Sequence, residues 1–120
     1  MATERIQRVE QAIKEEVAVI LQRELKDPRV GFVTITRARV TADLQQATVY
    51  FSVLEGRGDM EQTEAGLRSA QGFIRTLLGS RLRLRVTPQI QFRLDETVGQ
   101  SIRIAKLLKG IEKDEGRKNP

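Results

Sequence analysis

The sequence contains no cysteine, histidine or tryptophan. Without cysteine the chain can form neither a disulfide framework nor a thiolate metal site, which fits a reducing compartment. The lack of histidine removes the commonest acid–base group at neutral pH and the usual zinc ligand. Catalysis would have to rest on carboxylates, lysine or an activated hydroxyl group, so the composition argues against an enzyme and predicts no metal and no cofactor.

Long apolar runs are also absent. No stretch approaches the roughly 20 apolar residues that a membrane-spanning helix needs, and no apolar signal segment follows Met1–Arg5. We therefore expect a cytoplasmic protein without a membrane partner. With 120 residues, the chain has room for one domain with a modest core.

Acidic residues are missing from residues 65–94, which hold six arginines and no Asp, Glu or Lys. The whole chain has 21 Lys plus Arg against 16 Asp plus Glu, so this segment supplies about the whole basic excess. A basic excess confined to one continuous segment is typical of a site for a polyanion.

The same segment has a helical pattern with a weak point. One face carries the apolar stripe Leu67, Ala70, Ile74, Leu77 and Leu78, and another carries Arg68, Gly72, Arg75 and Gly79. Glycine disfavours helix by about 1 kcal/mol, so Gly72 predicts a bend or break between two helices. Backbone N–H groups at the start of the second helix would then be open to a phosphate. Alternatively, Gly66, Gly72 and Gly79 allow close helix packing.

Hydrophobic periodicity predicts a helix, two strands, the bent helical segment capped by Asp59, and a third strand. The expected ranges are 3–26, 32–40, 47–54, 60–81 and 89–94. The first two strands should form an antiparallel hairpin, and the third should lie parallel beside the second, because a helical crossover precedes it. The expected fold is α+β, a three-stranded sheet with helices on one face.

Two segments after the second helical region are less regular. Residues 81–86 alternate arginine with Leu82, Leu84 and Val86. An extended conformation would place three guanidinium groups on one side and bury these three apolar side chains on the other. We divide the chain into a domain over residues 1–96 and an extension over 97–120, in which Ser101 caps a short amphipathic helix before a disordered tail. That helix would dock on the open sheet face, bind a partner, or order only on binding.

Several segments resemble a known family. The order of elements resembles the type II KH domain, and the amino-acid sequence of particular stretches resembles ribosome-binding factor A, a family of bacterial small-subunit assembly factors. The resemblance covers about residues 4–111 and rests mainly on Leu25–Gly31, Val33–Thr36, Ala47–Ser52 and Ala70–Arg75. The Gly-x-x-Gly loop of an ordinary KH domain is reduced here to Ala70-Gln71-Gly72, which favours contact with folded ribosomal RNA over capture of four nucleotides.

The resemblance implies a non-enzymatic role. The protein would bind the immature 30S subunit and its 16S ribosomal RNA as a monomer, without a small-molecule substrate, during late maturation and processing of the RNA ends, and would matter in cold adaptation. The residues expected to contact RNA are Arg68, Ser69, Ala70, Gln71, Gly72, Arg75, Arg81, Arg83 and Arg85, with Arg5, Arg8 and Arg29 at the rim.

Two rival interpretations remain. One is a protein-interaction module whose sheet or C-terminal helix binds an acidic partner. The other is a small carboxylate hydrolase or nuclease that uses Asp43, Asp95 or Glu96. A base-stacking platform is not expected, because of the strand aromatics only Tyr50 points away from the inward set.

Overall fold

The computed structural model describes residues 2–54 and 59–97 of the chain. Its elements in chain order are α1 (Ala2–Arg23), the 3-10 helix η1 (Pro28–Val30), β1 (Val33–Val40), β2 (Gln46–Val53), α2 (Met60–Leu82) and β3 (Gln89–Leu94). The expected order of elements is confirmed, and the predicted bounds of β3 agree with those in the structure.

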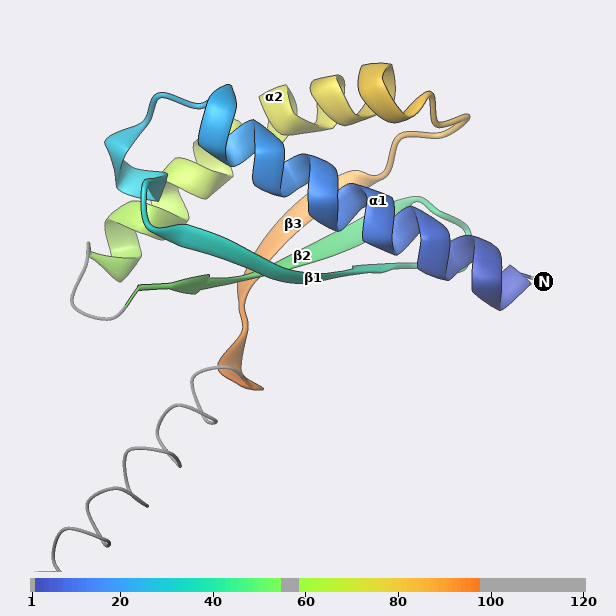
Figure 1. The fold of residues 1–120 in the computed structure, drawn as a ribbon, viewed down its shortest axis with the longest axis horizontal. Coiled ribbons are helices and arrows are strands. Elements are labelled where there is room, and N and C mark those ends of the chain that lie inside the picture. Colours follow the sequence, from blue (N-terminus) through green and yellow to red (C-terminus); the bar gives the residue numbers. More distant parts are fainter. Residues whose placement is uncertain (1, 55–58, 98–120) are drawn as a thin grey trace, which may run out of the picture.

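The three strands form one sheet in the order β1-β2-β3. β1 and β2 pair antiparallel, with an irregularity between Ile35 and Arg37, and β3 pairs parallel with β2. The predicted hairpin, the central place of β2 and the parallel position of β3 are confirmed (Figure 1). β3 is therefore an edge strand, preceded by the crossover through α2.

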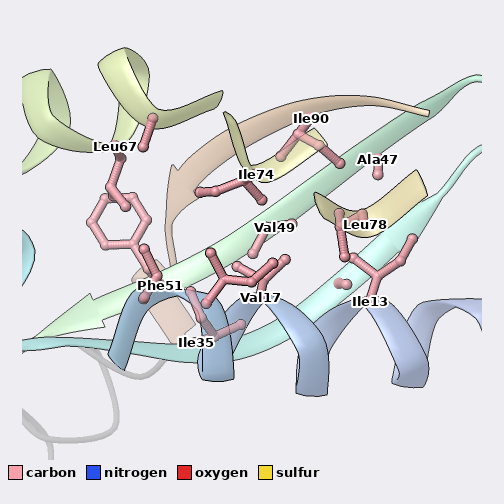
Figure 2. Close-up of a cluster of buried hydrophobic side chains, with 14 of the residues drawn as sticks. Ile13, Val17, Ile35, Ala47, Val49, Phe51, Leu67, Ile74, Leu78 and Ile90 are labelled. Carbon is pink, nitrogen blue, oxygen red and sulfur yellow. The ribbon is translucent and has the colours of Figure 1, made fainter. Parts of the chain in front are cut away.

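Both helices pack on the same face of the sheet. Ala47, Val49 and Phe51 alternate inward along β2 and are at most 1% exposed. They belong to one core cluster with Ile13, Val17 and Ile20 of α1 and with Leu67, Ile74 and Leu78 of α2 (Figure 2). This single core holds the two helices against the sheet and leaves the opposite sheet face uncovered by the described residues.

The turn after α1 is built by an Asp-Pro-Arg sequence. α1 ends at Arg23, short of the predicted Lys26, since the N–H groups of the two residues after Arg23 both donate to the Ile20 carbonyl. Asp27 then caps η1, accepting the Arg29 N–H at 3.0 Å and the Arg29 guanidinium at 2.7 Å. The side-chain hydrogen bond from Arg29 holds the pKa of Asp27 below its usual value.

α2 begins as predicted, because Asp59 is its N-cap and accepts the Glu61 N–H at 2.8 Å. The helix continues through Gly72 to Leu82 without interruption, although its axis changes direction midway (Figure 1). The predicted bend is confirmed and the predicted break is wrong. Gly72 therefore offers no helix N-terminus to a phosphate.

Residues 81–86 do not adopt the extended form. α2 includes Arg81 and Leu82, because Leu82 continues its apolar stripe beyond Leu78. Arg83 follows as the C-cap, with a left-handed backbone at φ 50°. Val86, expected to be buried, is 50% exposed.

The predicted C-terminal helix and tail, residues 101–120, lie outside the described residues. Among the helices that are described, none is long and apolar enough to span a membrane.

Candidate nucleic-acid interface

A groove of about 360 Å³ separates the N-terminal half of α2 from the edge strand β3. Arg68 and Gln71 line it from α2, and Phe92 and Arg93 line it from β3. Both arginines are exposed, so their guanidinium groups are open to solvent on the two sides of the groove. Glu64 and Glu96 also line the groove, which is therefore less basic than the local sequence suggests.

The glycines of α2 have different roles. A Cβ on Gly72 would meet nothing within 4 Å, so this position is open to an incoming molecule. A Cβ on Gly66 would lie 3.0 Å from the Val30 side chain, and one on Gly79 would lie 2.6 Å from Thr87 Oγ1. Close packing thus explains Gly66 and Gly79, and it does not explain Gly72.

Arg75 attaches the loop between α2 and β3 to the helix. Its Nη2 donates to the Thr87 carbonyl at 3.0 Å and its Nε to the Pro88 carbonyl at 3.2 Å. The close approach of Gly79 to Thr87 brings the same loop against α2. Arg75 therefore positions the loop, and its remaining exposure is partial.

Arg83 and Arg85 stand on this loop. Both are exposed, and neither makes an ion pair with another residue in the described ranges. Arginine presents a planar fork of donors that matches phosphate oxygens. A loop fixed to α2 and bearing two unpaired guanidinium groups is suited to bind a polyanion.

Arg81 is not available in the same way. Its guanidinium contacts Glu16 at 2.9 Å and Glu24 at 2.5 Å, both on or just after α1. The hydrogen bond that Arg81 donates to Glu16, followed by the one it donates to Glu24, raises the pKa of Arg81. The segment lacks acids in sequence, but α1 supplies them in space, so Arg81 joins the two helices.

The other expected contact residues are dispersed. Ser69 is exposed, whereas the Ala70 side chain is 7% exposed and belongs to the core. Arg29 is paired with Asp27 in the turn before β1. Arg5 and Arg8 are exposed near the start of α1, and the structure does not place them on the groove.

Some exposed side chains near the site were not among the expected contacts. Arg93 lines the groove together with Arg68, and Phe73, next to Gly72, is 47% exposed. The alternation of β3 indicates that Arg93 points outward, but sequence alone does not show that it lines the same groove as Arg68. Phe73 lies beside the apolar stripe of α2 and outside the set of buried residues, which accounts for its exposure.

Two of the three acidic candidates, Asp43 and Asp95, have structural roles. Asp43 accepts the Thr41 hydroxyl at 2.6 Å and the Gln45 N–H at 3.1 Å, so it shapes the turn of the hairpin. The Thr41 hydrogen bond, followed by that of Gln45, lowers the pKa of Asp43. Asp95 is 5% exposed and accepts the Thr36 hydroxyl at 2.5 Å. Residues 2–54 and 59–97 contain no cluster of three metal-ligating side chains.

The sequence model of the ribosome-binding factor A family matches residues 5–108 of the chain. The chain belongs to the ribosome-binding factor A family. Its similarity to solved members agrees with this assignment and with the expected fold class. The crystal structure of ribosome-binding factor A from Thermus thermophilus is 25% identical, with a TM-score of 0.67 over 74% of this chain and 94% of that one.

Two further structures of the ribosome-binding factor A family are similar. A Thermotoga maritima protein assigned as a candidate factor of this kind, solved by NMR, is 35% identical, with a TM-score of 0.62 over 74% of this chain and 85% of that one. A homology model of the Thermus thermophilus factor, fitted into a cryo-EM map of its complex with 30S, is 26% identical, with a TM-score of 0.61 over 72% of this chain and 90% of that one.

Proposed function

We propose that this protein binds the small ribosomal subunit by contacting phosphates of 16S ribosomal RNA. The observation that carries the proposal is the family match over residues 5–108, together with a similar factor whose coordinates are fitted into a 30S complex. The contacting surface is the flank of α2 that faces β3, extended by the loop 83–88. Its cations are Arg68, Arg83, Arg85 and Arg93.

The geometry supports phosphate contact over base-specific recognition. Arg83 and Arg85 lie on a loop that Arg75 fixes to α2 through two backbone carbonyls. Gly72, halfway along the same flank, leaves room for a backbone to approach. Phosphate contacts position a protein on folded RNA through its shape and need no sequence code.

The protein acts without catalysis in this proposal. It joins the immature subunit late in assembly, supports processing of the 16S RNA ends, and matters most in the cold, when misfolded RNA helices are hardest to resolve. Arg75 holds the loop of the interface in place, Arg81 joins the two helices, and the other four arginines make the contacts.

Co-sedimentation with purified small subunits tests the proposal. The variant Arg83→Glu/Arg85→Glu should bind at least about tenfold more weakly, since a hydrogen bond to a charged group contributes about 1.5–3 kcal/mol. The matched control Arg23→Glu/Lys26→Glu makes the same change in net charge at exposed positions near the end of α1. If both variants bind equally, or if the wild-type protein does not sediment with small subunits, the proposal is wrong.

A further inference from the structure

The strands contribute only positive charge to the sheet face turned away from the helices. Acids from outside the strands approach this face: Asp95 contacts Arg37, Glu10 contacts Arg39, and Glu96 lines the hollow beside Arg93. The three strands contain three arginines and no Asp or Glu. The irregularity after Ile35 sends Ala38 into the core and turns Arg37 and Arg39 to the open face. Arg93 alternates outward on β3, so all three strand arginines stand on this face.

One row of this face is a stacked arrangement. Arg37, Tyr50 and Arg93 are direct neighbours in the register of the three strands. The Arg37 guanidinium carbon lies 4.1 Å from the centroid of the Tyr50 ring, which is cation–π geometry.

The buried Nε atom of Arg37 lies close to Asp95 without a hydrogen bond to it. Its Nε is buried and has no hydrogen-bond partner in the described part of the chain. It lies 3.6 Å from Asp95 Oδ2, which receives the Thr36 hydroxyl instead. The Arg37 side chain is still 42% exposed. Tyr50 and Asp95 thus hold a guanidinium plane that remains partly open to solvent.

This row is continuous with the groove beside α2. A second hollow of about 280 Å³ is lined by Arg37, Tyr50, Arg93 and Glu96 among others. Arg93 and Glu96 also line the first groove. The two hollows therefore meet at the edge strand β3, and a strand lying in the groove can pass over Arg93 onto the open face.

We propose that an unpaired RNA segment crosses the β3 edge from the groove onto the open sheet face, where a base stacks on the Arg37 guanidinium. The inference rests on the proposed function and adds a second contact to it. Bases stack on arginine planes as well as on aromatic rings. Thr48 and Gln91, neighbours in the next outward row, offer neutral hydrogen-bonding groups to base edges. An acidic protein would use the charge of this face but not the stacked plane.

Tyr50 gives a direct reporter, because it is the only tyrosine of the chain. With selectively labelled tyrosine, NMR of the full-length protein observes its ring signals during titration with an oligoadenylate of about twelve nucleotides, within the usual site size. We expect the ring signals to shift on saturation. An acidic peptide of equal charge is titrated in parallel and should leave them nearly unchanged.

The variant Arg37→Lys keeps the charge beside Asp95 and removes the stacking plane. It should bind the oligoadenylate about tenfold more weakly in fluorescence anisotropy, since stacking contributes about 1–3 kcal/mol per base. Arg23→Lys is the matched control and should bind as the wild type does. Tyr50→Thr is a second variant, and threonine also suits a strand. It should weaken binding by a similar factor, and it replaces Arg37→Lys as the test if that variant does not fold.

Two results would overturn the inference. One is wild-type affinity for RNA in both sheet variants, with ring signals that do not move. The other is an equal shift with the acidic peptide, which would identify a surface for acidic proteins. Co-sedimentation with subunits separates the two proposals. If the wild type binds subunits, Arg83→Glu/Arg85→Glu does not, and both sheet variants bind RNA normally, the interface on α2 stands and the sheet contact does not.

Discussion

Substitution of Gly72 by alanine should make the protein more stable. Glycine within a helix costs about 1 kcal/mol relative to alanine. The new methyl group would meet no atom within 4 Å, so no packing penalty offsets this gain. The midpoint of thermal unfolding should rise by about 4 °C for a chain of this size. Circular dichroism at the helix band measures the unfolding midpoint on heating and the free energy of unfolding in urea.

Gly79→Ala is the contrasting variant in the same helix. Its Cβ would lie 2.6 Å from Thr87 Oγ1, so the loop must move. Overpacking costs about 1–3 kcal/mol, which exceeds the gain in helix propensity, and the unfolding midpoint should fall. A loss of stability in Gly72→Ala as large as that in Gly79→Ala would refute the assignment of Gly72 to an open surface.

The open position also predicts a separation of binding from stability. Gly72→Val keeps stability near that of the wild type, because valine is a better helix former than glycine. Its branched side chain fills the space through which RNA would approach, so subunit binding should weaken. Equal losses of stability and binding would support a packing role for Gly72.

Two further predictions concern charged groups. Arg81→Gln should lower the unfolding midpoint and leave subunit binding unchanged, since Arg81 is paired with Glu16 and Glu24. Arg83→Gln should leave the midpoint unchanged and weaken subunit binding; calorimetry measures the midpoints and co-sedimentation the binding. The pKa of Asp27, lowered by the Arg29 hydrogen bonds, should return toward about 3.9 in Arg29→Ala by carbon-detected NMR titration. Because this pKa is lower in the folded state, its contribution to stability is present above about pH 4 and is lost as pH falls through the lowered value; an unchanged pKa in Arg29→Ala would contradict this.

Local pattern predicted most of the fold. The strict alternation of Gln89–Leu94 and its flanking Thr-Pro fixed both ends of β3, and the apolar run from Ala47 placed β2 at the centre of the sheet. The alternation of residues 81–86 was misleading because it is short and overlaps the end of a helical stripe. There, packing of Leu82 against the core outweighed the period-two pattern.

The candidate site was less predictable, because it depends on contacts distant in sequence. Arg81 meets Glu16 and Glu24 across separations of 65 and 57 residues, so its neutralisation cannot be inferred from an acid-free segment. Strict alternation from Ile35 would place Arg37 inward, and only the irregularity in β1 turns it toward Tyr50. Long-range packing and one backbone irregularity thus decide which arginines are available.

The salt dependence of subunit binding tests the central claim most directly. Log affinity falls as log salt concentration rises, and each phosphate contact makes this fall steeper by about 0.7–0.9. The slope of the variant Arg83→Ala/Arg85→Ala should therefore be less steep than that of the wild type by about 1.5, whereas Arg23→Ala/Lys26→Ala should leave the slope unchanged. A wild-type slope near zero, or equal slopes in all three proteins, would contradict the account.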